Sequence, residues 1–280
     1  MNDYLDFMAR AKQEIVPQSD EYVNEADGLL YCKHCHTPRQ CRLSWSGTVI
    51  FPRVQCRCQE EAYEAVQAAR RHAEHLAHIA TLKADGLQDK ALHRYTFAND
   101  SGANPEMRRA HAYVEHWQEM RERGMGLLLW GGVGTGKTFF AGCIANALID
   151  QGVPVLMTNL SRVLNAMSGF YFDERNHFVD SLRHYDLLVI DDLGIERDTD
   201  FALEQIFHVI DSRCRSGLPM IVTTNLTLQE MKHPTDTAHE RIYSRVLERC
   251  VPIKINGYNH RVDQARENLR AARILLDGST

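Results

Sequence analysis

The chain has 280 residues and a net charge of −5, and 44% of its residues are hydrophobic. A chain of this length has room for one good-sized core and a smaller module, so two folded units are expected. It contains no run of about 18 apolar residues, and its first residues lack the basic-then-apolar order of a secretory signal. These features exclude a membrane span and favour a cytoplasmic protein.

Charge is distributed unevenly over the first 58 residues. Residues 1–28 carry seven acids and two bases, whereas residues 29–58 carry five bases and no acid. An acidic arm is thus followed by a basic, cysteine-rich module, and a uniform polyanion-binding surface is not indicated. Two interpretations of these basic residues stay open: simple solvation at the surface, or contact with nucleic acid or a partner.

Five of the eight cysteines lie between residues 32 and 58. In a reducing compartment this clustering favours a metal site over disulfides. The pairs Cys32 with Cys35 and Cys56 with Cys58 offer four thiolates to one tetrahedral Zn²⁺. Alternative ligands, any of which can replace Cys58, are Cys41, His34 and His36.

The segment between the two cysteine pairs is predicted to form a small hairpin from residues 43–45 and 48–51, turning at Ser46-Gly47. So short a segment buries too little apolar surface to fold unaided, whereas structural zinc contributes on the order of 10 kcal/mol to such domains. The metal is therefore expected to act as the core of this module. Free thiols and an iron–sulfur cluster are the alternatives.

An alanine-rich stretch without glycine or proline, residues 59–84, predicts a helix that connects this module to the rest of the chain. A loop over residues 99–105 and a helix over residues 106–123 follow. The predicted organisation is an arm with a zinc module (1–58), a connecting helix (59–85) and a nucleotide-binding domain (86–280).

A phosphate-binding loop is the strongest signal in the chain. Every fixed position of the pattern G-x-x-x-x-G-K-[S/T] is matched by Gly131, Gly132, Val133, Gly134, Thr135, Gly136, Lys137 and Thr138. The apolar strand 127–130 precedes it, and a helix that Gly152 is placed to stop follows it. Glycines let backbone N–H groups close around a phosphate, Lys137 reaches the β- and γ-phosphates, and the Thr138 hydroxyl can bind Mg²⁺. We expect ATP here.

Residues 184–192 form an apolar strand that ends in two acids. A buried parallel strand would deliver Asp191 to the edge of the sheet beside the phosphate loop, where it can hold Mg²⁺. Asp192 can then act as a general base toward the attacking water. A simple acidic turn is the alternative, made weak by the position about fifty residues after a phosphate loop.

The rest of the chain continues the same alternation. A strand over residues 153–158, a helix around 162–167 and a helix over 199–215 are followed by the strand 219–225, which ends at Asn225. At the same edge of the sheet, Asn225 can position water or the γ-phosphate, although it can also be a plain turn former.

Arginines recur near the end of the chain. Arg241, Arg245 and Arg249 follow one ridge of a helix predicted over residues 237–249, where one of them can reach a neighbouring subunit's nucleotide. A salt-bridged surface face is the alternative. After a short strand (251–255), Arg261 begins a helix that ends near residue 276, where it can fold over the phosphates or be solvated.

Taken together, residues 87–274 resemble the AAA+ ATPases of the DnaC/DnaI type, which are bacterial and phage replicative helicase loaders. Transposase helper ATPases of the IstB type share this core. The resemblance is carried by residues 131–138, 187–194, 223–225, 240–245 and 259–261. It implies that Asn225 is sensor 1, Arg245 the arginine finger with Arg241 as runner-up, and Arg261 sensor 2. Asp192 departs from the glutamate that is common in AAA+ proteins, which favours slow, switch-like use of ATP.

The cysteine module favours the loaders, because loaders of this kind carry a separate amino-terminal domain, zinc-bound in several, that grips a hexameric helicase. The resemblance therefore implies an α/β AAA+ fold with a small zinc domain, and ATP, Mg²⁺ and Zn²⁺ as cofactors. The implied partners are a DnaB-type helicase, single-stranded DNA and further copies of the chain in a hexamer or spiral. An IstB-like helper that acts on duplex DNA is the alternative.

Overall fold

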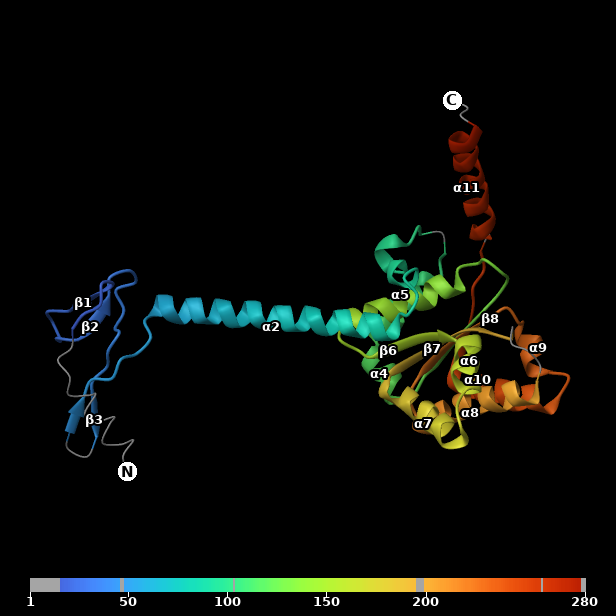
Figure 1. Cartoon of the computed structure of the whole chain (residues 1–280), viewed down its shortest axis with the longest axis horizontal. Helices are drawn as coiled ribbons and strands as arrows, with labels where there is room; N and C mark the ends of the chain where they lie inside the picture. The colour runs from blue at the N-terminus through green and yellow to red at the C-terminus, as the bar shows by residue number, and fades with distance from the viewer. Residues whose placement is uncertain (1–15, 46–47, 103, 195–198, 258, 278–280) are drawn as a thin grey trace. The chain divides into compact units, whose positions relative to one another are not determined.

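The computed structural model describes residues 16–45, 48–102, 104–194, 199–257 and 259–277. The chain divides into two compact units, Met1–Leu76 and Ala77–Thr280, and the boundary falls inside the helix α2 (Arg57–Gly86) (Figure 1). In the part of the chain that the structure describes, no helix combines the length and the apolar character that crossing a bilayer requires.

The first unit contains two short antiparallel sheets. Strand β1 (Glu21–Val23) pairs with β2 (Leu30–Cys32), and β3 (Leu43–Trp45) pairs with β4 (Thr48–Ile50). The predicted hairpin is confirmed in its strands, and its turn at Ser46-Gly47 lies outside the described residues. Buried apolar side chains are few among the described residues of this unit: Leu30, Cys32, Ile50 and Cys56. An apolar core of this size contributes little to folding, as the sequence led us to expect.

Helix α2 covers the stretch predicted to be helical and extends to Gly86. Within the second unit, its last turns pack on the core through Ile79 and Leu82. The helix ends where the chain passes very close to the sheet. A Cβ on Gly86 would lie 1.9 Å from the Val155 carbonyl oxygen, so only glycine fits there.

The second unit is built on a five-stranded parallel sheet, which confirms the predicted α/β class. Its strands, given in chain order, are β5 (Gly126–Trp130), β6 (Val155–Asn159), β7 (Leu187–Leu193), β8 (Met220–Thr224) and β9 (Cys250–Lys254). Their spatial order is β6-β7-β8-β5-β9. Because all pairings are parallel, the carboxyl ends of the five strands lie along one edge. Ligands of open α/β sheets bind at that edge.

Helices cover both faces of this sheet. Leu127 and Leu129 join the apolar cluster that includes α3 (Met107–Glu115) and α5 (Lys137–Asp150). The intervening Leu128 joins the opposite cluster, with α8 (Asp200–Ser216) and α10 (Thr237–Arg249). In Figure 1, α5 lies on one side of the strands and α8 with α10 on the other. Alternate residues of a strand point to opposite faces, so near-continuous apolar runs are what a doubly covered sheet requires.

The other helices are short or flank this core. They are α4 (Trp117–Glu122), α6 (Leu160–Ser168), α7 (Phe172–Ser181), α9 (Leu228–Lys232) and α11 (His260–Asp277). The single helix predicted over residues 106–123 is wrong in one respect, because α3 and α4 meet at His116, whose φ is −98° and ψ is 23°. Tyr113 before this turn and Trp117 after it are both buried in the core.

Candidate functional site

The phosphate loop joins β5 to α5 through backbone conformations that favour glycine. Gly131, Gly134 and Gly136 have φ values of 150°, 77° and 96°, and Gly136 is the N-cap of α5. A Cβ on Gly131 would lie 2.4 Å from the carbonyl oxygen of Ile255. The loop therefore wraps tightly around the amino end of α5, where unpaired backbone N–H groups and the helix dipole attract anions.

Lys137 occupies the centre of this loop. Its Nζ donates hydrogen bonds of 2.9 and 2.7 Å to the carbonyl oxygens of Gly131 and Gly132, and one of 2.7 Å to Oδ1 of Asn225. The residue is only 5% exposed. The structure thus brings together the predicted lysine and the predicted sensor asparagine, which come from positions 88 residues apart in the chain.

A cluster of oxygen atoms lies at the end of β7. Thr138 Oγ1 donates to Asp191 Oδ1 at 3.0 Å, and Thr223 Oγ1 donates to the same oxygen at 2.6 Å. Burial raises the pKa of Asp191 above its ordinary value, and the two hydroxyl hydrogen bonds oppose that shift. A hydroxyl and a partly buried carboxylate fit the oxygen ligands that Mg²⁺ takes beside a nucleotide. Thr138 and Asp191 are therefore suited to hold that ion.

Asp192 has an unusual backbone. Its φ is +61°, and its N–H donates to Thr223 Oγ1 at 2.9 Å. The β7–β8 pairing shifts register between Ile190 and Leu193, which is the mark of a bulge. A non-glycine residue in this region costs about 1–2 kcal/mol, and such residues are concentrated at functional sites. At the two acids, the bulge interrupts the alternation of β7 side chains between the two faces of the sheet.

Two of the predicted arginines, Arg241 and Arg245, contact other residues of the second unit. Arg245 is ion-paired with Asp211 and Glu248, and Arg241 stacks its guanidinium 4.2 Å above the Phe207 ring. Both are on α10, and neither has a recorded contact with Lys137, Asp191 or Asn225 in the described part of the chain. An arginine finger acts on a neighbour's nucleotide, so its role stays a prediction. The side chain of Arg261, the predicted sensor 2, lies outside what the structure describes.

The four predicted cysteine ligands meet in the first unit. The sulfur atoms of Cys32, Cys35, Cys56 and Cys58 all lie within 4.8 Å of one another. Two of the separations, Cys32 to Cys58 and Cys56 to Cys58, are 3.6 Å. Tetrahedral Zn–S bonds of about 2.3 Å require sulfur atoms about 3.8 Å apart, so the cluster fits zinc.

The ionisation of these thiols also suits a cation. A hydrogen bond with the Thr37 hydroxyl lowers the pKa of Cys35 to about 5, while hydrogen bonding among the sulfurs raises the pKa of Cys58 to about 12. Crowded thiolates repel one another and share protons. A bound divalent ion offsets this repulsion. The alternative ligands Cys41, His34 and His36 are not members of the cluster of described residues.

Two contributing residues were missed by the sequence reasoning. Thr223 binds both acids of β7, and strand alternation places it on the same side of β8 as position 225, a signal that was available. Arg39 is buried, with Nη2 3.9 Å from Cys32 Sγ and Nη1 3.4 Å from the fully buried Glu21 carboxylate. No local pattern marks Arg39, because its partners come from separate strands.

Comparison with known proteins gives four informative matches, three of sequence and one of structure. The family described as IstB-like ATP binding protein matches residues 58–268. The replicative helicase loader DnaC of Escherichia coli K12 is 29% identical over 116 residues, which is 40% of this chain and 46% of the loader. The loader DnaI of Bacillus subtilis 168 is 25% identical over 150 residues, 50% of this chain and 48% of that protein.

A crystal structure of DnaI superposes with a TM-score of 0.50 at 25% identity, covering 61% of this chain and 93% of that one. These matches confirm the predicted AAA+ fold and the resemblance to helicase loaders and IstB-like proteins. In sequence, the matched region spans about half the length of the curated relatives. The family match begins at residue 58, so it leaves Cys32, Cys35 and Cys56 outside.

Proposed function

We propose, from the premise that this chain belongs to the family of IstB-like ATP binding proteins, that it is an ATPase that loads a replicative DNA helicase onto single-stranded DNA. The observation that carries the proposal is the convergence of Lys137, Asn225, Thr138 and Asp191 at one sheet edge, together with a separate four-cysteine unit. The residues at the sheet edge suit a nucleotide-dependent switch. The four-cysteine unit, which lies largely outside the family match, supplies a module for binding a target.

Each residue of the nucleotide site has a defined task in this proposal. Lys137 leaves its loop carbonyls to contact the β- and γ-phosphates, while the N–H groups of residues 131–136 surround them. Thr138 and Asp191 hold Mg²⁺, which when bound neutralises charge on the phosphates. Asp192 accepts a proton from the attacking water, and Asn225 orients that water or the γ-phosphate.

The neighbouring subunit completes the site. Arg245 of one copy stabilises the charge that develops on the phosphoryl group held by the next copy, a contribution of about 10³ to 10⁵ in rate for such arginines. Arg261 acts as sensor 2 within its own subunit. ATP thereby links catalysis to the stacking of copies in a hexamer or spiral. The short side chain of Asp192 and its constrained backbone suit slow, switch-like turnover.

The cysteine unit, with Zn²⁺ on Cys32, Cys35, Cys56 and Cys58, grips the helicase in this account, and the ATPase domain binds single-stranded DNA in the cytoplasm. The second candidate, a transposition helper acting on duplex DNA, rests on the resemblance to IstB-like proteins, the family whose model matches residues 58–268. The transposition-helper candidate assigns no function to the four-cysteine unit. The cysteine cluster is therefore the feature that distinguishes the two candidates.

A binding experiment separates them. The full chain is incubated with a hexameric DnaB-type helicase, with and without ATP, and complexes are isolated by size exclusion. We expect a complex with the native chain and with Cys41→Ser, and its loss with Cys56→Ser. If the chain bound no helicase either with or without ATP, and formed ATP-dependent filaments on duplex DNA in electron micrographs, the transposition helper would be favoured.

A further inference from the structure

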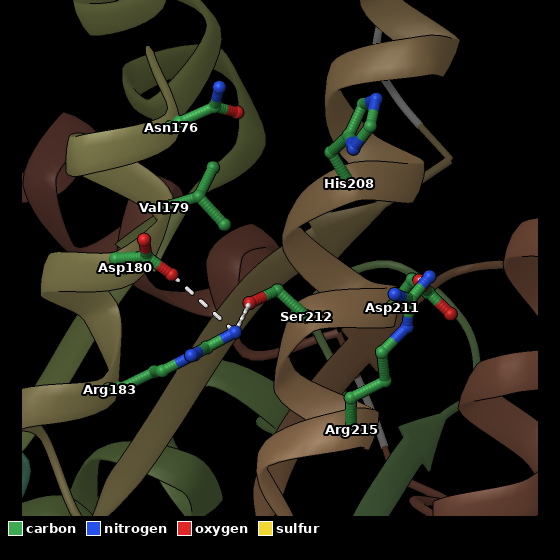
Figure 2. A pocket seen from close by; sticks show the side chains of 8 residues that line it. All are labelled: Asn176, Val179, Asp180, Arg183, His208, Asp211, Ser212 and Arg215. Atoms are coloured by element: carbon green, nitrogen blue, oxygen red, sulfur yellow. Dashed lines mark hydrogen bonds and ion pairs between the residues drawn. The ribbon is translucent and has the colours of Figure 1, made fainter. Parts of the chain in front are cut away.

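Asp211 is a buried acid in the middle of α8. Its side chain is 6% exposed, and its carboxylate pairs with Arg215 one turn later on the same helix and with Arg245 from α10. In Figure 2, Asp211 and Arg215 lie side by side at one end of a pocket of about 260 Å³ between α7 and α8. At the other end, Arg183 points toward Asp180 and Ser212. Carboxylates are rarely buried this fully unless they are paired.

The contact with Arg245 is electrostatic. Nε of Arg245 lies 3.1 Å from Oδ1 of Asp211, yet that oxygen has no hydrogen bond of acceptable geometry. Asp211 therefore has two counter-ions, of which Arg245, at 40% exposed, is less accessible to solvent than Arg215, at 72%. A buried charge that loses its partner is strongly unfavourable, and this cost resists any movement of the arginine away from Asp211.

Arg245 is held at two further points. Its Nη1 contacts Glu248 Oε2 at 3.0 Å, and its backbone carbonyl accepts a hydrogen bond from Cys214 Sγ at 3.6 Å. The side chain is still 40% exposed. In the described part of the chain, Nη2 donates no hydrogen bond. The guanidinium is thus held by its ion pairs with Asp211 and Glu248, while 40% of the side chain stays exposed to a ligand from outside the subunit.

We propose that Asp211 is a positioning residue for Arg245, holding its guanidinium so that Nη2 meets the phosphates bound by a neighbouring copy of the chain. This inference rests on the proposed function, in which Arg245 acts between subunits. Asp211 itself touches neither nucleotide nor water. Its effect is geometric, because a flexible arginine would have to be ordered during each catalytic event, whereas a clamped arginine is already in place.

A purely structural role is the competing explanation, since α8 packs closely on α10. The two roles differ in which subunit needs Asp211. A brace between the helices would matter in every subunit that must stay folded. A positioning residue matters only in the subunit that donates the arginine. A mixture of two defective full-length chains, together with the melting temperature of the chain that donates the arginine, separates these cases.

In the experiment, an Arg245→Ala chain supplies an intact nucleotide site, and a Lys137→Ala chain supplies an intact arginine. Each is inactive alone, and their mixture with helicase and single-stranded DNA hydrolyses ATP. Adding Asp211→Asn to the Lys137→Ala donor should lower kcat by about 10- to 100-fold with an unchanged KM for ATP, as misplacing a group by about 1 Å can do. Adding it to the Arg245→Ala acceptor, where the contact with Arg245 is already lost, should leave kcat unchanged, and the melting temperature of the Lys137→Ala donor should be the same with and without Asp211→Asn.

Two matched variants complete the design. Asp180→Asn removes an exposed carboxylate from the same pocket and should have no effect in either chain, whereas Asp211→Glu in the donor should recover part of kcat. A melting temperature of the donor lowered by Asp211→Asn, or no loss of kcat in the donor, would overturn this inference and leave the proposed function standing. An inactive mixture of the two parent chains would instead remove the intersubunit role of Arg245, and this inference with it.

Discussion

Thr223 on β8 donates a 2.6 Å hydrogen bond to Asp191 on β7, and the same hydroxyl accepts the backbone N–H of Asp192 at 2.9 Å. One side chain on a neighbouring strand therefore fixes the orientation of the first acid and the backbone of the second. Because Thr138 reaches the same carboxylate oxygen, the strand pairing and the phosphate loop are joined at a single atom. The nucleotide site depends on sheet register as much as on its motifs.

Removing that hydroxyl should weaken the magnesium site. Thr223→Val deletes a hydrogen bond to a charged group, worth about 1.5–3 kcal/mol, so we expect Mg²⁺ to bind the ATP-loaded protein about 10- to 100-fold more weakly. Loss of this bond also raises the pKa of Asp191 further, which should move the acid limb of ATP turnover to higher pH. Magnesium titrations measure the first effect, and rates of ATP turnover over a pH series measure the second. Thr223→Ser keeps the hydroxyl and should behave as the native chain.

The ionised Asp191 carboxylate should lower the free energy of unfolding of the nucleotide-free protein at neutral pH. Burial raises its pKa in the folded state, so the folded chain binds that proton more tightly than the unfolded chain. The contribution of this group to stability is thus complete below the ordinary pKa of aspartate, about 3.9, and is lost as pH rises through the raised folded pKa.

It follows that Asp191→Asn should raise the melting temperature at pH 7 without Mg²⁺, although it should abolish ATP turnover. The gain should shrink between pH 7 and pH 4, because the raised folded pKa makes the native carboxyl take up its proton before the unfolded one does. Thermal unfolding at the two pH values tests this expectation, with the exposed Asp173→Asn as control. A lower melting temperature for Asp191→Asn at pH 7 would contradict it.

Arg213 should be the most important polar side chain for the stability of the sheet domain. It is 2% exposed and donates to the carbonyl oxygens of Leu182, Tyr185, Asp186 and Pro219, and burial lowers its pKa to about 10. Arg213→Met would remove these hydrogen bonds from a buried charged donor, with a loss of about 3–5 kcal/mol in the free energy of unfolding.

Denaturant titration measures that loss. Arg109→Met, which removes a half-exposed arginine paired with Glu106, is the matched control and should change the free energy of unfolding by less than about 1 kcal/mol. If Arg213→Met unfolds at the same denaturant concentration as this control, the carbonyl contacts contribute nothing measurable.

Zinc content tests the cysteine cluster. We expect one zinc ion per native chain and per Cys41→Ser chain, and less than that for Cys32→Ser or Cys56→Ser. Chelation should unfold the first unit and leave nucleotide binding by the second intact, because structural zinc supplies about 10 kcal/mol or more in such domains. Atomic emission and circular dichroism give the readouts. Retention of zinc by Cys56→Ser, or its loss from Cys41→Ser, would show a different ligand set.

The local motifs were predictable because their signals are local. The phosphate loop needs glycines at fixed conformations, β7 needs a long apolar run, and α10 begins and ends at the predicted residues 237 and 249. The pairing of Cys32 and Cys35 with Cys56 and Cys58 was also within reach, because the spacing of metal ligands is a property of the sequence.

What sequence could not supply depends on neighbours distant in the chain. The strand order β6-β7-β8-β5-β9 is set by packing among separate elements, and no pattern within one strand encodes it. The buried Arg213 and Asp211 look like ordinary members of a polar helix until α10 and the carbonyl groups beside β7 are placed around them. The short helix α7 was missed since its apolar residues are few.

The central claim is that the loop around Lys137 binds ATP with magnesium. Equilibrium titration of the full chain with a fluorescent ATP analogue, with and without Mg²⁺, measures this binding directly. We predict magnesium-dependent binding by the native chain and by the exposed control Lys232→Ala, and loss of binding by Lys137→Ala. Undiminished binding by Lys137→Ala, or none by the native chain, would contradict the account.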